Sequence, residues 1–294
     1  MLQAVKQRIK PRKKLMANLW RLSAVQLTSG PDPTANLAKV DQLLSQLPKT
    51  EQHLAVLPEG VTVFAGPDGL NLQLAEVLGS GPLQKAYAAL AKKHQLYLLV
   101  GTLPTCSSDP TRFAASSLLY SPEGELIGDY QKIHLFDALV NDSSKQYLES
   151  ATTMPGDKLS LVQLQQLKLG MLICYDMRFP GLTQALAAQG MNVMAVPSAF
   201  TTVTGEAHWH TLLRARAIES QSFVVAPAQV GTHPNGRQTY GHSLIIDPWG
   251  RILAEADGSN EMVLSVETDL DLCQQLAEKM PVRHHNRFQS EFKA

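Results

Sequence analysis

The stretch LGMLICYDMRFP at residues 169–180 does most to decide the fold of this chain of 294 residues. Its first five residues form an apolar run of the kind that makes a buried strand. Cys174 follows at once, and after a short polar segment comes Pro180, a residue type common at the first position of a helix. The stretch therefore predicts a strand, a turn that carries a thiol, and a helix.

Cys174 is a candidate nucleophile because of its place at this turn. Free backbone N–H groups and the positive end of the following helix favour a thiolate there, and the thiolate is the reactive form of cysteine. A single cysteine is, however, commonly a small buried packing residue. On its own, Cys174 is compatible with either role.

Two further charged residues lie at the ends of predicted strands. LAVLPEG at residues 54–60 contains an apolar strand followed by Glu59, and Lys132 comes just after a predicted strand at 125–130. Each of them alone fits a solvated surface charge. Beside a thiol, however, a carboxylate can serve as general base and an ammonium can bind an oxyanion. The three residues together therefore predict a site for acyl transfer.

Short apolar segments alternate with longer amphipathic ones along the rest of the chain. Strands are predicted at residues 20–27, 54–57, 96–102, 114–120, 125–130, 168–173, 192–196, 223–228, 243–247, 251–256 and 262–266. Helices are predicted at 33–47, 83–94, 181–188, 206–220 and 270–279. This order predicts an α/β fold in which helices cover the outer faces of two sheets. The expected architecture is a four-layer α-β-β-α sandwich, in one domain spanning residues 16–294.

The first fifteen residues differ from the rest of the chain. Residues 1–15 contain basic side chains and no acid, although the whole chain has 26 basic and 26 acidic side chains. We expect this segment to be a disordered basic extension that comes from a misassigned upstream start or from a vector. An organelle-targeting segment and a membrane-surface patch are the alternatives.

Composition limits the other classes of function. Three well-separated cysteines, Cys106, Cys174 and Cys273, argue against a disulfide framework and suit a reducing, cytoplasmic compartment. No apolar run reaches the roughly 20 residues that span a bilayer, and the balanced charge gives no reason to expect a nucleic-acid partner. The histidines of HWH at 208–210 and HH at 284–285 have no cysteine or carboxylate cluster at ligand spacing, so we expect no metal site.

The motifs together resemble a known family. PE at 58–59, YQKIHLFD at 130–137 and CYDMRF at 174–179 are similar to the three catalytic blocks of the nitrilase superfamily of carbon–nitrogen hydrolases, in the family's order. Further similar blocks are PSAFTTVTGEAHW at 197–209, LRARAIE at 213–219, YGHS at 240–243 and DPWG at 247–250. The resemblance covers residues 20–288 and implies the same α-β-β-α sandwich. It also implies protomers that pair through their helical layers into a homodimer or a larger homo-oligomer.

The resemblance implies roles for individual residues. Cys174 is expected to be the nucleophile, Glu59 the general base and Lys132 the stabiliser of the oxyanion, together with the backbone N–H of Tyr175. Glu149, in YLES at 147–150, matches the second glutamate of the family and is expected to orient Lys132. A plain loop carboxylate is the alternative for Glu149. The expected reaction passes through a thioester and needs neither a metal nor an organic cofactor.

Arg178 is the residue expected to hold the substrate. A guanidinium can clamp a carboxylate through two parallel hydrogen bonds. The resemblance implies that Arg178, with Phe200 and Thr204, holds the α-keto acid tail of a small-molecule amide. The alternative is a structural ion pair between Arg178 and Asp176 or another acid.

The blocks are similar to the branch of the superfamily that contains deaminated glutathione amidases and omega-amidases. The leading expectation is hydrolysis of deaminated glutathione to 2-oxoglutarate and cysteinylglycine, a metabolite-repair reaction. His233 and Arg237 are then possible contacts of the leaving group's glycine carboxylate, or else exposed loop residues. The alternatives are an omega-amidase acting on 2-oxoglutaramate, another small-amide or carbamoyl hydrolase, and a catalytically idle binding protein. The intact set of polar site residues argues against the last of these.

Overall fold

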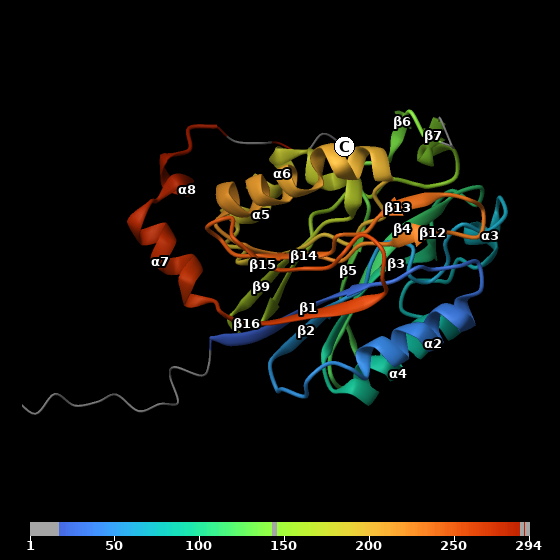
Figure 1. Ribbon diagram of the computed structural model, residues 1–294, viewed down its shortest axis with the longest axis horizontal. Helices are drawn as coiled ribbons and strands as arrows, with labels where there is room; N and C mark the ends of the chain where they lie inside the picture. The colour runs from blue at the N-terminus through green and yellow to red at the C-terminus, as the bar shows by residue number, and fades with distance from the viewer. Residues whose placement is uncertain (1–17, 143–145, 289–290, 292–294) are drawn as a thin grey trace, which may run out of the picture.

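Two six-stranded sheets form the centre of the computed structural model, which describes residues 18–142, 146–288 and 291 (Figure 1). The first sheet has the strand order β16 (Met262–Asp269), β1 (Leu19–Gln26), β2 (His53–Val56), β3 (Tyr97–Cys106), β4 (Phe113–Tyr120) and β5 (Leu126–Gln131). The second has the order β15 (Ile252–Glu255), β14 (Leu244–Ile246), β11 (Phe223–Ala226), β10 (Val193–Ala195), β9 (Leu167–Met171) and β8 (Leu161–Leu164).

Helices cover the outer face of each sheet, so the chain folds into the predicted α-β-β-α sandwich. In Figure 1, α5 and α6 lie above the two sheets and α2 and α4 lie below them. The helices are α2 (Pro33–Leu44), α3 (Leu70–Gln73), α4 (Pro82–His94), α5 (Pro180–Ala188), α6 (Thr202–Ser220), α7 (Asp271–Lys279) and α8 (Val282–His285). The predicted fold class is confirmed, and every predicted strand has a counterpart in one of the two sheets.

The strand directions bring two of the expected site residues toward each other. Strand β2 pairs in parallel with β1 and β3, and β10 pairs in parallel with β9 and β11. Strand β5 runs in the same direction as β3, because both are antiparallel to β4. The carboxyl ends of β2 and β5 therefore meet at one edge of their sheet, where Glu59 and Lys132 follow. Such edges are where open α/β sheets commonly bind ligands.

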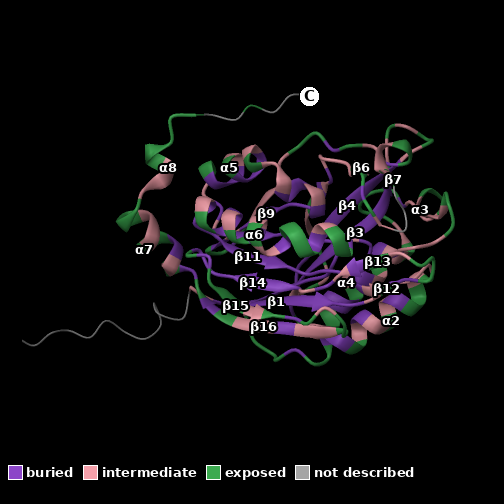
Figure 2. Ribbon diagram, turned by 45° about the horizontal axis from the view of Figure 1, so that its top comes forward, coloured by how far each residue is buried: buried purple, intermediate pink, exposed green. Residues whose placement is uncertain are grey.

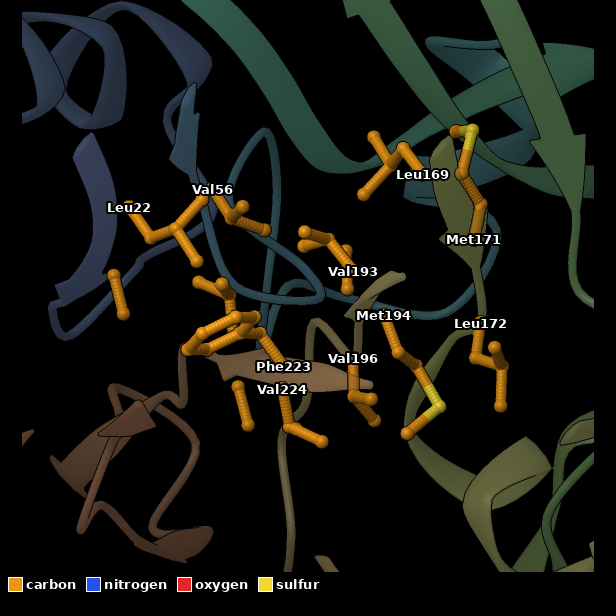
Figure 3. Packing of buried hydrophobic residues seen from close by; sticks show 14 of the residues in the cluster. Leu22, Val56, Leu169, Met171, Leu172, Val193, Met194, Val196, Phe223 and Val224 are labelled. Atoms are coloured by element: carbon orange, nitrogen blue, oxygen red, sulfur yellow. The ribbon is translucent and has the colours of Figure 1, made fainter. Parts of the chain in front are cut away.

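The largest part of the core lies between the two sheets and continues beneath α5 and α6. Leu22 and Val56 of the first sheet belong to the same buried cluster as Leu169, Met171 and Val193 of the second (Figure 3). A second cluster joins the other face of the first sheet to α2 and α4. Figure 2 shows the buried strands between helices whose outer faces are exposed. Burying each large aliphatic side chain in such a core stabilises the fold by about 1.5–3 kcal/mol.

Helix α6 begins earlier than the sequence predicts. The predicted helix begins at residue 206, directly after Gly205, whereas α6 begins at Thr202. Thr201 caps it by accepting a hydrogen bond from the N–H of Thr204. Gly205 lies inside the helix because a Cβ there would come within 2.3–2.6 Å of the Tyr240 ring. Close packing against that ring, and not a helix boundary, therefore accounts for this glycine.

Several short elements were not predicted. Two small hairpins, β6 (Asp137–Leu139) with β7 (Gln146–Leu148) and β12 (Val230–Thr232) with β13 (Gln238–Tyr240), lie outside the main sheets. A 3₁₀ turn, η1 (Glu149–Ala151), follows β7 directly. The strands of these hairpins are three residues long, so they carry little periodicity for a sequence pattern to reveal.

Two expectations concern the N-terminal segment and a possible membrane span. The basic extension expected at residues 1–15 lies outside the described residues, so it and the domain boundary at residue 16 stay predictions. Within the described part of the chain, no helix is long and apolar enough to cross a membrane.

Candidate active site

Cys174 lies at a sharp turn where the chain leaves the second sheet. It is the first residue of a short 3₁₀ helix, η2 (Cys174–Arg178), and its φ of 48° is in the left-handed region. Such a conformation costs a residue other than glycine about 1–3 kcal/mol, so surrounding contacts must hold the turn. One of them is the hydrogen bond that the N–H of Cys174 donates to Pro197 O, at 2.8 Å. The predicted turn is present, and the α-helix that follows it begins at Pro180, as the sequence predicts.

Asp176 holds this turn from beneath. Its carboxylate is fully buried and accepts hydrogen bonds from the Tyr130 hydroxyl at 2.8 Å and from the N–H of Ile173 at 2.9 Å. The other carboxylate oxygen accepts from the backbone N–H of His134 at 3.0 Å and lies 2.7 Å from Nδ1 of the same residue. The alternative ion pair with Arg178 is wrong, because Asp176 directs both oxygens to these other groups.

We expect Asp176→Ala to lower the free energy of unfolding by about 3 kcal/mol, since it leaves several buried donors without an acceptor. The measurement is urea denaturation followed by circular dichroism. Asp129→Ala, at an exposed aspartate of β5, is the matched control and is expected to change stability by less than about 0.5 kcal/mol. Equal stability of the two variants would show that Asp176 does not support the turn.

Lys132 lies between two carboxylates. Its Nζ is 2.7 Å from Oε1 of Glu59 and 2.8 Å from Oε2 of Glu149, and its side chain is only 2% exposed. Glu59 follows β2, Lys132 follows β5, and Glu149 begins η1 directly after the β6–β7 hairpin. The backbone N–H of Phe136 donates to Glu149 Oε2 at 2.6 Å and fixes that carboxylate against the ammonium. The three charges are therefore held in a row, with the cation between the two carboxylates.

This arrangement keeps Lys132 and Glu59 ionised. Burial alone would lower the pKa of Lys132, but the charges of Glu149 and Glu59 outweigh burial and hold it well above its usual value. Burial would likewise raise the pKa of Glu59, yet the charge and hydrogen bond of Lys132 hold it below the ordinary range. Glu59 is thus a carboxylate able to accept a proton at neutral pH.

The thiol of Cys174 is the proton donor that Glu59 faces. The Glu59 carboxylate is hydrogen-bonded to Cys174, and the backbone N–H of Ala199 donates to the sulfur. Burial raises the pKa of Cys174, and the charge of Glu59 raises it further, against the opposing effects of Lys132 and Ala199. The expectation of a resting thiolate is therefore wrong. The short 3₁₀ turn supplies less positive potential than a long helix would, and a neighbouring carboxylate opposes ionisation.

A cavity of about 490 Å³ opens above these four residues. Glu59, Lys132, Glu149 and Cys174 line one part of it. The remaining wall includes the following residues: Phe64, Asp68, Asn71, Phe136, Tyr147, Tyr175, Arg178, Ala199, Phe200, Thr201, Thr204, Asn235 and Arg237. The structure therefore brings the expected reactive groups together in a chamber large enough for a small organic molecule.

Arg178 lies at the cavity wall, against two aromatic rings. Its guanidinium carbon is 5.8 Å from the centroid of the Tyr175 ring and 5.1 Å from that of Phe200. Its Nη1 lies 3.3 Å from Nδ1 of His208. No carboxylate in the described part of the chain forms an ion pair with Arg178. A guanidinium held by ring faces keeps donors free for an acidic ligand.

Phe200 lies against Arg178 and Thr204 lines the same cavity, but the two residues differ in burial. Phe200 is only 5% exposed, and its ring centroid is 5.0 Å from that of Trp209, so it forms a rigid wall. Thr204 Oγ1 is 2.8 Å from Oγ1 of Thr201, near the start of α6. Both line the cavity, and their expected contact with the substrate stays a prediction.

His233 and Arg237 are placed differently from each other. His233 is 2% exposed, and its ring nitrogens lie 2.9 Å from Ser29 O and 2.8 Å from Thr239 Oγ1. It does not line the cavity, so its expected contact with a leaving group is wrong. The sequence showed a histidine in a loop of glycine, proline and asparagine, where a buried side chain was not expected.

Arg237 does line the cavity. Its guanidinium lies between two rings, 4.7 Å from the centroid of Phe64 and 5.1 Å from that of Tyr147. Nη2 donates to Ala199 O at 3.1 Å, and the buried Nε has no hydrogen-bond partner among the residues that the structure describes. The positive charge of Arg237 also contributes to lowering the pKa of Glu59. Arg178 and Arg237 give the cavity two cationic positions.

Other residues of the site were missed in the sequence. Phe64 and Tyr147 hold Arg237, Gln229 donates to the backbone carbonyl of Glu59 at 2.9 Å, and Ala199 presents its N–H to the sulfur. Tyr147 is two residues from Glu149, and this proximity in the sequence could have indicated that Tyr147 lies at the site. The others act through backbone groups or ring faces, which no motif spacing reveals.

The buried ammonium of Lys132 supplies the positive charge between the two glutamates of the site. It occupies the position between Glu59 and Glu149 that a cation would otherwise take, and it satisfies both carboxylates. The site can therefore polarise a carbonyl through an ammonium and backbone N–H groups.

Comparisons with known proteins agree with this geometry. A family model described as carbon–nitrogen hydrolase matches residues 21–278. Deaminated glutathione amidase of Yersinia enterocolitica is 41% identical over 271 residues, which cover 92% of this chain and 93% of that protein. The Homo sapiens protein of the same name is 37% identical over 270 residues, 90% of this chain and 82% of that protein. The crystal structure of Saccharomyces cerevisiae Nit3, described as a member of branch 10 of the nitrilase superfamily, is 31% identical, has a TM-score of 0.80, and matches 92% of this chain and 97% of that one. The chain therefore belongs to the carbon–nitrogen hydrolase family of the nitrilase superfamily.

Proposed function

We propose that this protein hydrolyses the amide bond of deaminated glutathione and releases 2-oxoglutarate and cysteinylglycine. The observation that carries the proposal is the placement of Cys174 against the Glu59–Lys132–Glu149 chain, in a cavity that also holds two arginines. Deaminated glutathione has a carboxylate at each end, and the two cationic positions can take one each. The names of the relatives found in Yersinia enterocolitica and Homo sapiens support the same substrate.

The first half-reaction forms a thioester. Glu59 accepts the thiol proton as the sulfur of Cys174 attacks the amide carbonyl. The carbonyl oxygen gains negative charge, which the Lys132 ammonium and the backbone N–H of Tyr175 stabilise. When the tetrahedral adduct collapses, the C–N bond breaks. The leaving amine takes the proton that Glu59 received.

The second half-reaction returns the acid. Glu59 takes a proton from water, the hydroxyl attacks the thioester carbonyl, and the same donors hold the second oxyanion. The C–S bond then breaks, and the proton on Glu59 passes to the sulfur. Glu149 keeps the Lys132 ammonium in place through both steps and compensates its charge.

Arg178 is proposed to hold the α-keto acid end of the substrate. Its guanidinium lacks a carboxylate partner among the described residues and lies over two ring faces at the cavity wall. Phe200 forms the rigid side of this subsite, and the Thr204 hydroxyl is a hydrogen-bonding group near it. A guanidinium can hold a carboxylate through two parallel bonds, which fixes orientation as well as charge.

Arg178→Ala is expected to raise the KM for deaminated glutathione by at least about tenfold, because a charge-assisted bidentate contact is worth about 1.5–3 kcal/mol. Steady-state kinetics of the two enzymes measures this. The control substrate is the corresponding amide with the α-keto carboxylate replaced by a methyl ketone, for which the KM values of the two enzymes should agree. An unchanged KM for deaminated glutathione would remove Arg178 from the clamp.

Arg237 is proposed to contact the other end of the substrate, the glycine carboxylate. It lines the same cavity, where the rings of Phe64 and Tyr147 hold its guanidinium. A leaving group that reaches Arg237 favours deaminated glutathione over 2-oxoglutaramate, which releases only ammonia. Omega-amidase activity is therefore the second candidate, supported by the Arg178 subsite alone.

The direct test compares kcat/KM for deaminated glutathione and for 2-oxoglutaramate on one enzyme preparation, with Cys174→Ala as the blank. A preference of about a hundredfold for deaminated glutathione, close to 3 kcal/mol, is the expected result. The reverse preference would make the protein an omega-amidase. Activity on neither would leave another small-amide or carbamoyl substrate, or an idle binding protein.

The pH dependence of kcat/KM should be a broad plateau. The active form has Glu59 ionised, Lys132 charged and Cys174 protonated. Because the pKa of Glu59 is lowered, the acid limb should lie below about pH 4.3, the usual value of a glutamate. Because the pKa values of Cys174 and Lys132 are raised, the basic limb should lie above about pH 8.5, the usual value of a cysteine. A kinetic pH profile checks both limbs, and a limb near neutrality would contradict this charge assignment.

Assembly into a homodimer or larger homo-oligomer through the helical layers is proposed as well. Ile218 of α6 and Trp249 are large apolar side chains that are 44% and 56% exposed, and such side chains commonly mark interfaces. Light scattering would measure the mass.

We also propose a cytoplasmic location, supported by three cysteines that form no disulfide. Cell fractionation with a thiol-labelling reagent would test it.

A further inference from the structure

Two histidines and a glutamate come together at a place the amidase reaction does not use. His210 lies on α6, His242 lies between β13 and β14, and Glu255 is the last residue of β15. None of the three lines the cavity that holds Cys174. Their side chains are about one third exposed, at 32%, 29% and 36%, so the cluster is open to solvent.

The three ligand-type atoms converge on one point. Nε2 of His210 is 2.9 Å from Oε1 of Glu255, and Nδ1 of His242 is 3.1 Å from the same oxygen. All three residues can present a ligand atom within 4.8 Å of the others. Ligands of a tetrahedral zinc ion lie about 3.3 Å from one another, since zinc–nitrogen distances are about 2.0–2.1 Å. The two nitrogen–oxygen spacings are thus close to those of a metal site, and the two imidazole nitrogens lie within 4.8 Å of each other.

The backbone around His242 already fixes its imidazole. His242 has a φ of 53°, in the left-handed region, and its carbonyl accepts a hydrogen bond from Trp209 Nε1 at 2.7 Å. The ring of Tyr240 packs on its imidazole, with centroids 4.4 Å apart. Gly258 leaves room for the ring, because a Cβ there would lie 2.7 Å from His242 Nε2. The residue is therefore oriented toward the cluster by contacts on several sides.

We propose that His210, His242 and Glu255 bind a divalent transition metal ion of the zinc type. The donor set of two imidazoles and one carboxylate suits zinc, whereas calcium and magnesium prefer oxygen donors alone. In the free protein, each ring nitrogen that faces Glu255 can donate its proton to the carboxylate. On binding, those nitrogens become ligands, and each neutral imidazole carries its proton on the other nitrogen. Three protein ligands leave at least one position for water.

The bound ion would join three separate parts of the second sheet's outer layer. It would tie α6 to the connection before β14 and to the edge strand β15. Because α6 also carries Thr204 and begins beside Phe200, the ion would stabilise the helix that forms one wall of the cavity. The proposed role is structural support of the helix and does not depend on the proposed substrate. This cluster was not predicted from the sequence, because Glu255 and His242 are far from His210 along the chain.

The test is a Zn²⁺ titration of the full chain by calorimetry, after the Cys174 thiol has been alkylated with iodoacetamide so that it cannot bind zinc. We expect one equivalent of Zn²⁺ to bind. His210→Gln and Glu255→Gln should each raise the Kd at least about tenfold. His285→Gln, at an exposed histidine of α8, is the matched control and should leave the Kd unchanged. All three variants should retain amidase turnover before alkylation, which shows that they are folded.

The absorption spectrum of bound Co²⁺ distinguishes a defined metal site from surface histidines that bind metal weakly. Co²⁺ replaces zinc and gives a visible absorption spectrum that reports its coordination. The wild-type spectrum should show low-coordinate cobalt, and it should be lost in His210→Gln. Zn²⁺ binding that is no tighter than in the double variant His210→Gln/His242→Gln would overturn the proposal. So would a cobalt spectrum that the substitution leaves unchanged.

Discussion

Replacing Cys174 with alanine is expected to lower kcat/KM for the amide substrate by at least about 10⁴-fold, since removal of a covalent nucleophile has effects of this order. Alanine keeps the Cβ and therefore the same backbone strain at φ 48°, so the turn and the fold should be retained. The hydrogen bond from the N–H of residue 174 to Pro197 O does not involve the side chain and should also be retained. Kinetics and thermal unfolding, measured on the same preparation, check the two halves of this expectation.

The other cysteines provide matched controls. Cys273 is buried in α7, and Cys106 is exposed at the end of β3, so the pair represents both environments. Cys273→Ala and Cys106→Ala should each keep kcat/KM within about twofold, because neither lines the cavity. Turnover retained in Cys174→Ala would refute the thioester mechanism. An equal loss in a control variant would show that the effect arises from the fold.

Lys132→Met should be nearly as damaging. Methionine has a similar length but removes the ammonium that stabilises the oxyanion, and loss of such a donor costs about 10²–10³-fold in kcat. It also leaves Glu59 and Glu149 without their shared cation. Burial then acts on Glu59 without compensation and raises its pKa, so the base becomes protonated closer to neutral pH. Together these effects should lower kcat/KM by at least about 10³-fold.

The shifted base can be measured even when turnover is too slow. The rate at which iodoacetamide alkylates Cys174 depends on proton transfer to Glu59, and its pH profile can be followed with Cys106 replaced by alanine. In the parent enzyme its acid limb should lie below about pH 4.3, and in Lys132→Met it should move above that value. Lys39→Met, which breaks the exposed ion pair with Glu261, is the control and should change neither rate nor profile. An unshifted limb in Lys132→Met would mean that Lys132 does not control Glu59.

Much of the fold could be predicted because its strands are apolar runs, and the centre of the site could be predicted because its residues follow the ends of those strands. A buried strand is visible as an apolar run, and the residue just after it lies at a sheet edge. Glu59, Lys132 and Cys174 share this position, so their juxtaposition followed from the fold class. The inner faces of the strands, which carry Leu22 and Val193 among others, gave equally clear signals.

What could not be predicted depends on contacts between distant parts of the chain. The helix predicted from residue 206 left Gly205 outside it, although this glycine lies inside α6 and makes room for Tyr240, which is thirty-five residues away. His233 was expected at the cavity, yet buried hydrogen bonds to Ser29 and Thr239 hold it elsewhere. The charge state of Cys174 was also predicted wrongly, because local helix potential was considered without the burial and the carboxylate that face the sulfur.

The β6–β7 hairpin shows the same limit at the site itself. Its strands of three residues are too short for a periodic signal, yet they place Tyr147 and Glu149 at the cavity. Glu149 was found through family resemblance, and the Phe136 N–H that orients it was not found. Roles that depend on backbone groups are therefore the part of the site that a single sequence conceals.

The central claim is that Cys174 carries the 2-oxoglutaryl group as a thioester, and partitioning with hydroxylamine tests it most directly. Two amides of 2-oxoglutarate with different amines, deaminated glutathione and an anilide, are hydrolysed in the presence of hydroxylamine. A shared thioester must give the same ratio of hydroxamate to free acid from both substrates, because the amine has left before the nucleophiles compete. Ratios that differ between the two substrates, or hydrolysis that forms no hydroxamate, would contradict the thioester.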